Sequence, residues 1–377
     1  MWITSSLEAA KAPTNIALGN FDGVHLGHQQ VMAQILARPL STHAKSSIEI
    51  ASEIASTSAS TVPSNGLRNN QSLSAFHSGV LASGYSQLPT TAGEVTADLS
   101  ASTLAAAPEL PTSGAYATVV TFSPHPHEYF SGTARPLLTP VAEKAWQLAQ
   151  LGIHQLVMLP FNHALAELSP QEFVEKILIR GLKAQRISVG SDFHFGKGRS
   201  GNAQMLMDIA AAYGVPVVLV PLKHEKGDRI SSSRIREALQ SGSPTTATQL
   251  LGRPYTLTGR VVQGKQLGRT IGFPTANLQL PAKKFLPCTG VYSVRIYGTP
   301  NADAEPLKGV MNIGHRPTVN GQTLSIEVHI LNWAGDLYGK MLTVSLESFV
   351  RAEQKFDSLD ALKSQIAKDR DIAAATL

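Results

Sequence analysis

The feature that most restricts the fold of this chain is an alternation of short apolar runs with longer helical patterns. The apolar runs have the length of buried strands and lie at 117–122, 155–160, 186–190 and 215–221. Helical patterns separate them at 142–152, 170–182 and 202–214. Strands that alternate with helices of this length predict a parallel sheet with right-handed crossovers. We therefore expect an α/β parallel-sheet domain in the first part of the chain.

After about residue 252 the pattern changes to short strands with Gly-rich turns between them. These strands are expected at 255–264, 290–298, 307–314, 324–331 and 340–350. Their close spacing predicts antiparallel structure, in the form of a small β-barrel with one C-terminal amphipathic helix near 358–369. The chain thus divides into two expected domains, 1–243 and 244–377.

A segment rich in Ser, Ala and Thr interrupts the first domain at about 41–115. It has neither helical nor strand periodicity and few large apolar residues. Such a segment buries too little apolar surface to offset an ordering cost of about 1–2 kcal/mol per residue. We interpret it as a disordered insertion in a surface loop, which is tolerated because loop-closure entropy grows only slowly with length.

Charge and cysteine content exclude several classes of protein. The 377 residues carry a formal charge of +5, but the basic residues are scattered, so no nucleic-acid partner is expected. The chain has no apolar run of the roughly 20 residues that span a bilayer, and its first residues lack a signal pattern. The single cysteine, Cys288, excludes an internal disulfide and fits a reducing compartment. We expect a cytoplasmic protein without a membrane partner.

The stretch GNFDGVHLGH, residues 19–28, lies between an expected buried strand, TNIALG at 14–19, and an expected helix. A helix that begins at the carboxyl end of a parallel strand presents unpaired N–H groups to an anion. His25 and His28 can direct two imidazole donors at phosphate oxygens, and Gly27 would allow close approach. The structural alternative is that these histidines only cap the helix.

Three further segments can bring polar groups to the same edge of the sheet. Ser231, Ser232 and Ser233 open a helix between Arg229, Arg234 and Arg236, although an N-capped surface helix would have the same pattern. Residues 123–127 follow the strand at 117–122, and His125 is the better candidate there, since His127 can face solvent. After the strand at 186–190 come Asp192, Phe193 and Phe195, for which ligand contact and a core role are equally open.

In the expected barrel, the alternation in SIEVHIL places Ile326, Val328 and Ile330 on the core face and Glu327 with His329 on the other. A carboxylate at Glu327 could accept the proton of a neutral hydroxyl in phosphoryl transfer, whereas an ordinary solvated glutamate is the alternative.

A Gly-rich loop precedes the stretch PTAN at 274–277 in the same domain. Gly264, Gly268 and Gly272 would let this loop fold over phosphates, although a purely structural turn is the alternative. Thr275 and Asn277 alternate on one strand face and offer two neutral oxygens to Mg²⁺.

Six motifs in one order are similar to those of the bacterial bifunctional riboflavin kinase/FAD synthetases. They are GNFDGVHLGH, TFSPHPHEYF, VGSDFHFGKGRSGN, RISSSRIREAL, GKQLGRTIGFPTANL and SIEVHILNWAGDLYGK. The resemblance covers nearly the whole chain outside the insertion. It implies an HxGH, Rossmann-like nucleotidyltransferase domain that converts FMN and ATP to FAD, and a barrel that converts riboflavin and ATP to FMN with Mg²⁺.

The resemblance also implies roles for individual residues. His25, His28 and Glu327 would be catalytic. ATP in the first domain would be bound by Gly19, Asn20, Phe21, Asp22, Gly23, His25, Gly27, His28, Arg229, Ser231, Ser232, Ser233 and Arg236. FMN would be bound there by His125, Pro126, Asp192, Phe193 and Phe195. In the barrel, ATP and flavin would be bound by Gly264, Gly268, Arg269, Gly272, Pro274, Thr275 and Asn277, with Thr275 and Asn277 as metal ligands.

Three other functions remain open at this point. One domain could have lost its activity, the chain could bind flavin without turnover, or an HxGH transferase could be fused to an unrelated barrel. The presence of the motif residues in both halves, and of Glu327 in particular, argues against these alternatives. The oligomeric state, including a homo-oligomer, cannot be deduced from the sequence.

Overall fold

The computed structural model describes residues 1–36, 114–264, 266–299, 305–318 and 321–377. The insertion expected at 41–115 lies almost entirely outside the described residues. None of the helices within these ranges is long and apolar enough to cross a membrane.

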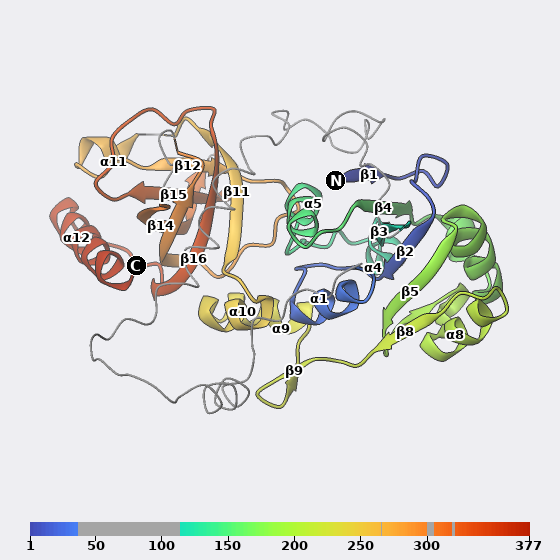
Figure 1. The fold of residues 1–377 in the computed structure, drawn as a ribbon. Helices are drawn as coiled ribbons and strands as arrows, with labels where there is room; N and C mark the ends of the chain where they lie inside the picture. Colours follow the sequence, from blue (N-terminus) through green and yellow to red (C-terminus); the bar gives the residue numbers. More distant parts are fainter. Residues whose placement is uncertain (37–113, 265, 300–304, 319–320) are drawn as a thin grey trace, which may run out of the picture.

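The first part of the chain forms a six-stranded sheet in which all neighbouring strands are parallel. Its order is β1-β4-β3-β2-β5-β8 (Figure 1). The strands are β1 (Trp2–Thr4), β2 (Thr14–Leu18), β3 (Tyr116–Ser123), β4 (Gln155–Pro160), β5 (Ala184–Gly190) and β8 (Val217–Val220). The expected parallel sheet is confirmed, and edge strand β1 is an addition that the sequence pattern did not indicate. The strand order reverses between β2 and β5, where open α/β sheets bind ligands at the carboxyl ends of their strands.

Helices cover both faces of the sheet. Residues of η2 (Phe173–Gly181), which has π-helical hydrogen bonding, and α8 (Ala203–Ala211) pack with Ile16 and Leu18 of β2. Residues of α1 (Leu26–Ala33) and α5 (Val141–Gln150) pack with Ala17 on the opposite face. Adjacent residues of β2 therefore enter different cores, which explains why this strand is apolar throughout.

Shorter elements connect these layers. They are α4 (Pro126–Ser131), α6 (His163–Ala166), α7 (Pro170–Glu172), β6 (His194–Phe195), η3 (Lys197–Arg199), β7 (Gly201–Asn202), β9 (His224–Glu225) and β10 (Asp228–Arg229). The pairs β6–β7 and β9–β10 are small antiparallel ribbons.

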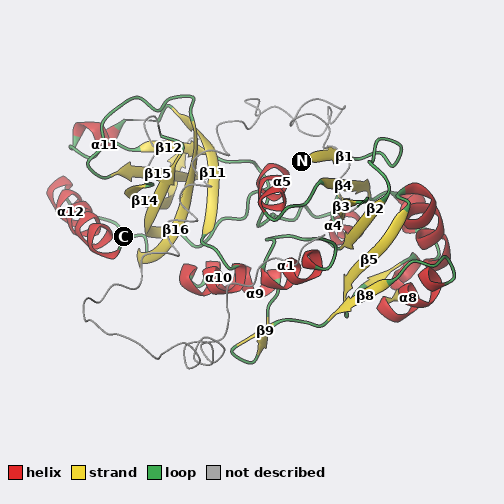
Figure 2. Cartoon of the chain, viewed as in Figure 1, coloured by secondary structure: helices red, strands yellow, loops and turns green. Residues whose placement is uncertain are grey.

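The second part of the chain is a closed antiparallel barrel in the order β11-β12-β15-β14-β13-β16 (Figure 2). Its strands are β11 (Tyr255–Val262), β12 (Ala276–Gln279), β13 (Gly290–Tyr297), β14 (Leu307–Thr318), β15 (Gly321–Ile330) and β16 (Met341–Arg351). A short helix α11 (Leu267–Thr270) precedes β12, and α12 (Leu359–Thr376) ends the chain. The expected barrel and C-terminal helix are both confirmed.

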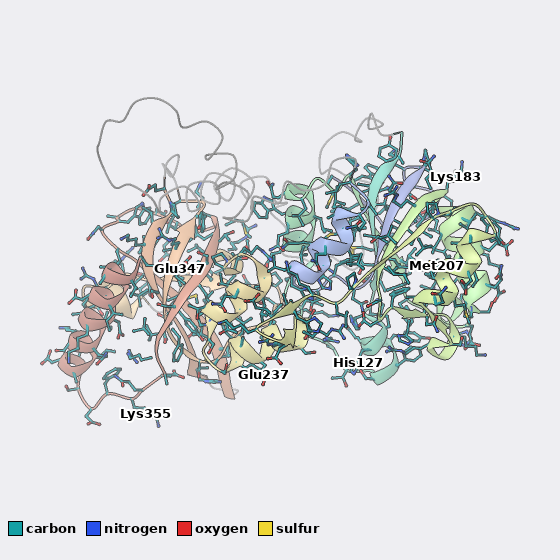
Figure 3. All side chains as sticks on the ribbon, turned by 60° about the horizontal axis from the view of Figure 1, so that its bottom comes forward. His127, Lys183, Met207, Glu237, Glu347 and Lys355 are labelled. Carbon is teal, nitrogen blue, oxygen red and sulfur yellow. The ribbon has the colours of Figure 1, made fainter. Side chains whose placement is uncertain are left out.

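Two helices join the domains. Ile235 and Leu239 of α9 (Ser232–Gln240) and Leu250 of α10 (Pro244–Leu251) belong to the same buried cluster as barrel residues such as Val344. Figure 3 shows Glu237 of α9 between the barrel and the sheet domain. Although α9 begins beside the sheet, its apolar face is therefore part of the barrel core.

A buried ion pair also crosses between the domains. Lys284, in the connection from β12 to β13, donates through Nζ to Glu143 Oε2 of α5 at 2.5 Å and to the carbonyl of Leu138 at 2.8 Å. The two charged side chains are only 1% and 3% exposed. Beside them, the backbone N–H of Leu137 donates to Lys283, and that of Phe285 donates to Leu137. The barrel thus holds the loop at 137–138 through backbone and side-chain contacts.

Candidate active sites

The turn after β2 has an unusual backbone that determines where its histidines lie. Phe21, Gly23 and Val24 have φ angles of 49°, 91° and 45°. For Phe21 and Val24 this left-handed conformation is strained, at a cost of roughly 1–3 kcal/mol each. The turn ends at His25, which is the N-cap of α1 and accepts the backbone N–H of His28 on Nδ1 at 3.2 Å.

The rings of His25 and His28 are stacked, with centroids 3.5 Å apart and planes inclined by 13°. Burial lowers the pKa of His25 from 6.5 to about 4, and burial lowers the pKa of His28 well below 6.5. Both imidazoles are therefore neutral near pH 7. Because Nδ1 of His25 accepts a hydrogen bond, its proton resides on Nε2, which is free to act as a donor. Nδ1 of His25 thus does cap the helix, as in the structural alternative, while Nε2 can still donate to a ligand.

Gly27 has a direct structural explanation. A Cβ atom at this position would lie 3.2 Å from the His25 ring, tighter than most real Cβ contacts. The glycine therefore allows the ring to lie flat against the first turn of α1. Close approach of phosphate to Gly27 remains a prediction.

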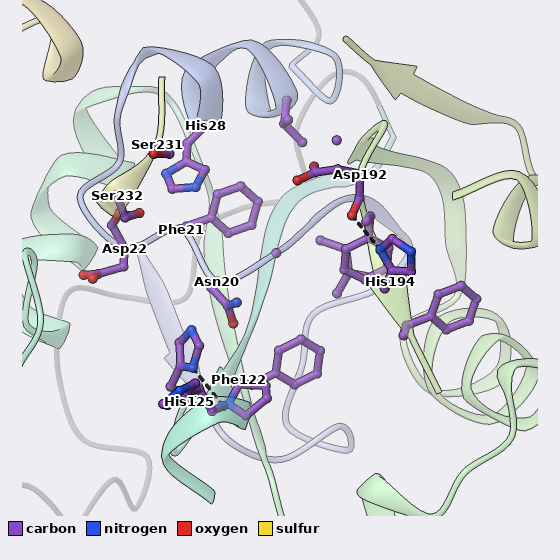
Figure 4. A pocket seen from close by; sticks show the side chains of 18 of the residues that line it. Asn20, Phe21, Asp22, His28, Phe122, His125, Asp192, His194, Ser231 and Ser232 are labelled. Carbon is purple, nitrogen blue, oxygen red and sulfur yellow. Dashed lines mark hydrogen bonds between the residues drawn. The ribbon is translucent and has the colours of Figure 1, made fainter. Parts of the chain in front are cut away.

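A cavity of about 980 Å³ opens at the carboxyl ends of β2, β3, β5 and β8. It brings together nearly all the residues expected to bind ATP and FMN in this domain. In Figure 4, Asp22, His28, Ser231 and Ser232 lie on one side, and Asp192 lies on another. The expected lining residues found here are Gly19, Asn20, Phe21, Asp22, His25, Gly27, His28, His125, Pro126, Asp192, Phe193, Phe195, Arg229, Ser231, Ser232 and Ser233.

Gly23 and Arg236 are absent from the cavity lining and lie behind it. Arg236 forms an ion pair with Asp22 and donates to the carbonyl of Pro136 at 3.1 Å. Asp22 also accepts the N–H of Thr139 at 3.2 Å, while its carbonyl accepts the hydroxyl of Ser232 at 2.7 Å. These contacts join the turn after β2 to the start of α9, so the two expected ATP motifs form one unit.

Asp192 and Arg229 form an ion pair across the cavity wall, each with nearly half of its side chain exposed. The sequence assigned Asp192 to FMN and Arg229 to ATP. Their contact places the two expected substrate regions next to each other, as a direct transfer between substrates requires.

His125 caps α4 and accepts the N–H of His127 on Nδ1 at 3.1 Å, while His127 itself is exposed. Burial, and next the charge of Arg135, lower the pKa of His125 to about 4. Its position is therefore similar to that of His25: a neutral imidazole at a helix start that faces the cavity.

The two phenylalanines expected to contact flavin have different surroundings. Phe195 is 6% exposed and belongs to the core with Phe173. Phe193 is half-buried and stacks on Phe195 with centroids 5.7 Å apart. Both side chains line the cavity. Phe195 is therefore a core residue that also contacts the cavity.

Sequence reasoning missed an aromatic group at the rim of the cavity. Phe130 is 70% exposed, and its ring centroid lies 5.7 Å from that of Phe161, which also contacts Phe122. All three line the cavity. The sequence showed only that Phe130 follows His125 by five residues, and its exposure at the cavity rim becomes visible in the structure alone.

In the barrel, the alternation expected for β15 is confirmed. Ile326, Val328 and Ile330 are buried, whereas Glu327 and His329 are half-buried. Glu327 Oε2 accepts the hydroxyl of Thr275 at 3.2 Å.

Asn277 of β12 lies opposite Glu327 in register, so Glu327 has Thr275 and Asn277 as close neighbours. A hydroxyl, an amide and a carboxylate, all of them hard oxygen donors, thus meet at one place on the barrel surface. This set fits Mg²⁺, which binds oxygen ligands and retains several waters. No group of three or more His, Cys, Asp or Glu side chains suited to a metal occurs among the residues with described positions.

The Gly-rich loop packs directly against this site. A Cβ at Gly264 would lie 2.4 Å from the side-chain nitrogen of Asn277, and one at Gly268 would lie 2.3 Å from the carbonyl of Phe273. These two glycines are thus required for close packing around PTAN. Gly272 has a φ of 88° and open space around it, while Arg269 and Pro274 are exposed.

Fold and sites together define a two-domain nucleotide-dependent transferase, with a polar cavity on a parallel sheet and a carboxylate site on a barrel. Comparison with known families gives the particular kind. Residues 7–52 and 103–234 match the FAD synthetase family model, and residues 251–377 match the riboflavin kinase model. The chain belongs to the family of bifunctional riboflavin kinase/FMN adenylyltransferases.

Individual relatives agree with this assignment. The bifunctional riboflavin kinase/FMN adenylyltransferase of Escherichia coli K12 is 42% identical over 67% of this chain and 79% of its own length. The enzyme of that name from Pseudomonas fluorescens is 41% identical over 70% and 82%. A crystal structure described as a macrolide-efflux protein from Streptococcus pneumoniae covers 99% of this chain and 98% of its own, with a TM-score of 0.69 and 24% identity, which shows a shared fold alone.

Proposed function

We propose that this chain makes flavin cofactors in two steps. The barrel transfers a phosphoryl group from ATP to riboflavin and forms FMN, and the sheet domain transfers an adenylyl group from a second ATP to FMN and forms FAD and pyrophosphate. The observation that carries the proposal is the different chemistry of the two sites. The barrel presents a carboxylate next to oxygen donors, whereas the acids of the cavity are held by arginines and its histidines are neutral.

Adenylyl transfer does not require a base, because the attacking group is the phosphate of FMN, whose second pKa is near 6. An oxygen of this phosphate attacks the α-phosphorus of ATP as the bond to pyrophosphate breaks. Nε2–H of His25 and the hydroxyls of Ser231 and Ser233 can donate to phosphate oxygens on which charge develops. The neutral state of His25 permits this donation without the titration of a cationic imidazole near pH 7.

Phosphorylation of riboflavin requires a base, because its 5′-hydroxyl is neutral and a poor nucleophile. Glu327 accepts the proton of this hydroxyl as its oxygen attacks the γ-phosphorus of ATP, and ADP leaves. The hydrogen bond from Thr275 orients the Glu327 carboxylate. Mg²⁺, held by Thr275 and Asn277 together with ATP, would neutralise charge on the phosphates.

The finer assignments extend this proposal. Residues 1–243 act as the adenylyltransferase and 244–377 as the kinase, with α9 as a structural bridge. The substrates are riboflavin, FMN and ATP, without nucleic acid or membrane as partner. The cytoplasm is the proposed location because the single cysteine suits a reducing compartment.

The test is an assay of the full chain with ATP and either riboflavin or FMN, with each flavin separated by chromatography. The proposal requires FMN and then FAD from riboflavin, and FAD directly from FMN. It further requires that chelation by EDTA stops FMN formation and that added Mg²⁺ restores it. Formation of only one product would support the alternative in which one domain has lost its activity.

A further inference from the structure

The turn that leads from α10 into the barrel lies directly against the turn that carries His25. Gly252 has a φ of 75°, and a Cβ there would lie only 2.5 Å from Cδ2 of Leu26 in the first turn of α1. From the same helix, Nε2 of Gln29 donates to the carbonyl of Leu251 at 3.2 Å and to that of Val24 at 3.1 Å. Figure 1 shows α10 and α1 next to each other between the two domains. The two turns are therefore packed as one unit.

Arg253, the residue after this glycine, connects the barrel to the histidine turn. Its Nη2 donates to the carbonyl of Gly23 at 2.8 Å, and its Nη1 donates to that of Val24 at 3.4 Å. Nη2 also donates to the side chain of Gln147 on α5. One guanidinium group thus connects three segments: the entry into the barrel at residue 253, the turn at 21–25 that carries His25, and helix α5.

The two carbonyls that Arg253 binds belong to the residues with positive φ that immediately precede His25. Val24 is β-branched and disfavours this conformation, so its backbone keeps this geometry only if its surroundings hold it. The planar guanidinium can bind neighbouring oxygens in a fixed arrangement, which a lysine cannot reproduce.

From this geometry we propose that Arg253 is a positioning residue for adenylyl transfer. It acts from the kinase side of the molecule: by holding the carbonyls of Gly23 and Val24, it aims the His25 ring and its Nε2–H at the cavity. The kinase reaction in the barrel takes place at Glu327, on a different strand, and does not depend on this contact. Loss of Arg253 should therefore affect one reaction of the chain and spare the other.

Electrostatics support this position. The charge of Arg253 is among the causes that lower the pKa of His25 and of His28, after burial and together with Arg229. Burial is the main cause of both shifts, and Arg253 adds a smaller contribution of the same sign.

The test is a comparison of both reactions in Arg253→Met and Arg253→Lys variants of the full chain. Since a misplacement of about 1 Å can cost about 100-fold, we expect Arg253→Met to lower kcat for FAD formation from FMN by about 10- to 100-fold. Riboflavin phosphorylation should change less than twofold. Arg253→Lys keeps the charge but lacks the planar guanidinium group, so its kcat should lie between those of Arg253→Met and the wild type.

Arg351→Met is the matched control. Arg351 is another half-buried arginine of the barrel, which binds Asp369 and the carbonyl of Ala352 and makes no contact with the histidine turn. This variant should lower the melting temperature without lowering kcat for FAD formation. If Arg253→Met left that kcat within twofold of the wild type, or lowered both activities equally at a temperature where it is folded, the positioning role would be wrong.

The inference rests on the proposed function. Measurements on the wild-type chain distinguish a failure of the proposed function from a failure of the role of Arg253. Absence of FAD formation by the wild type refutes the proposed function itself. FAD formation by the wild type that Arg253→Met leaves unchanged refutes only the role of Arg253.

Discussion

Replacement of Lys284 with Met should destabilise the protein strongly, because it removes one partner of a buried ion pair between the domains. Nζ of Lys284 lies 2.5 Å from Oε2 of Glu143 and 2.8 Å from the carbonyl of Leu138. With side-chain exposures of 1% and 3%, neither charge can be solvated by a small movement. Methionine has a similar volume, so the main effect is electrostatic and does not arise from a cavity.

The magnitude follows from the cost of a buried charge without a partner. Removal of one member of such a pair costs about 3–5 kcal/mol of the free energy of unfolding, because the other charge stays buried. Burial raises the pKa of the Glu143 carboxyl, while Lys284 opposes this shift. The pKa of Glu143 is already raised with Lys284 in place, so removal of Lys284 raises it further and the folded state takes up a proton at still higher pH than the unfolded state. The loss should therefore be largest at pH 8 and should shrink as the pH falls toward about 4.5.

Urea unfolding at pH 8 and at pH 5 measures this effect. Lys283→Met is the matched control, since the neighbouring lysine is half-exposed and its ion pair with Glu128 lies at the surface, where such pairs contribute about 0–1 kcal/mol. The double variant Lys284→Met/Glu143→Gln removes both charges and should recover at least half of the loss at pH 8. A loss below about 1 kcal/mol for Lys284→Met, or one equal to that of Lys283→Met, would refute the reasoning.

Three further predictions concern the two sites. Burial lowers the pKa of His25 to about 4 in the folded state, against 6.5 in the unfolded chain. Because the unfolded chain takes up a proton first, the free energy of unfolding should fall by up to about 3 kcal/mol as the pH is lowered from 6.5 to 4. Thermal unfolding of His25→Asn should show a weaker pH dependence than that of the wild type. Phe130→Ala should raise KM for FMN about 2- to 10-fold in FAD formation, because one aromatic contact contributes about 0.5–1.5 kcal/mol. Riboflavin phosphorylation should not change. An unchanged KM for FMN would exclude Phe130 from the flavin site. Thr275→Ala removes a hydrogen bond to a carboxylate and should lower kcat for FMN formation by about 10- to 100-fold, whereas equal loss of FAD formation from FMN would contradict the assignment.

Local patterns predicted the main architecture of both domains, although not edge strand β1. The alternation at 117–221 predicts the parallel sheet because each strand is buried on both faces and each helix has one apolar face. The period of two in SIEVHIL predicts which side Glu327 takes, because the barrel interior selects alternate residues. These features depend on residues close together in sequence, so they can be recognised from one sequence.

Other features depend on residues far apart in sequence, and the sequence alone did not indicate them. Arg236 is bound to Asp22, 214 positions earlier, and lies outside the cavity lining, while its contact with ATP stays a prediction. No local signal marks the pairing of Lys284 with Glu143 either. The positive φ of Val24 contradicts its intrinsic preference, and the hydrogen bond from Arg253 to its carbonyl is a contact that only the folded chain reveals.

The central claim is that two independent sites of unlike chemistry share one chain, and the most direct test is to measure both products in two single variants. Glu327→Gln removes the proposed base and should lower FMN formation from riboflavin by about 10²- to 10⁴-fold while FAD formation from supplied FMN persists. His28→Ala should do the reverse, with a loss of about 100-fold or more in FAD formation and normal phosphorylation of riboflavin. If either substitution abolished both reactions in a folded protein, the chain would not have two independent sites.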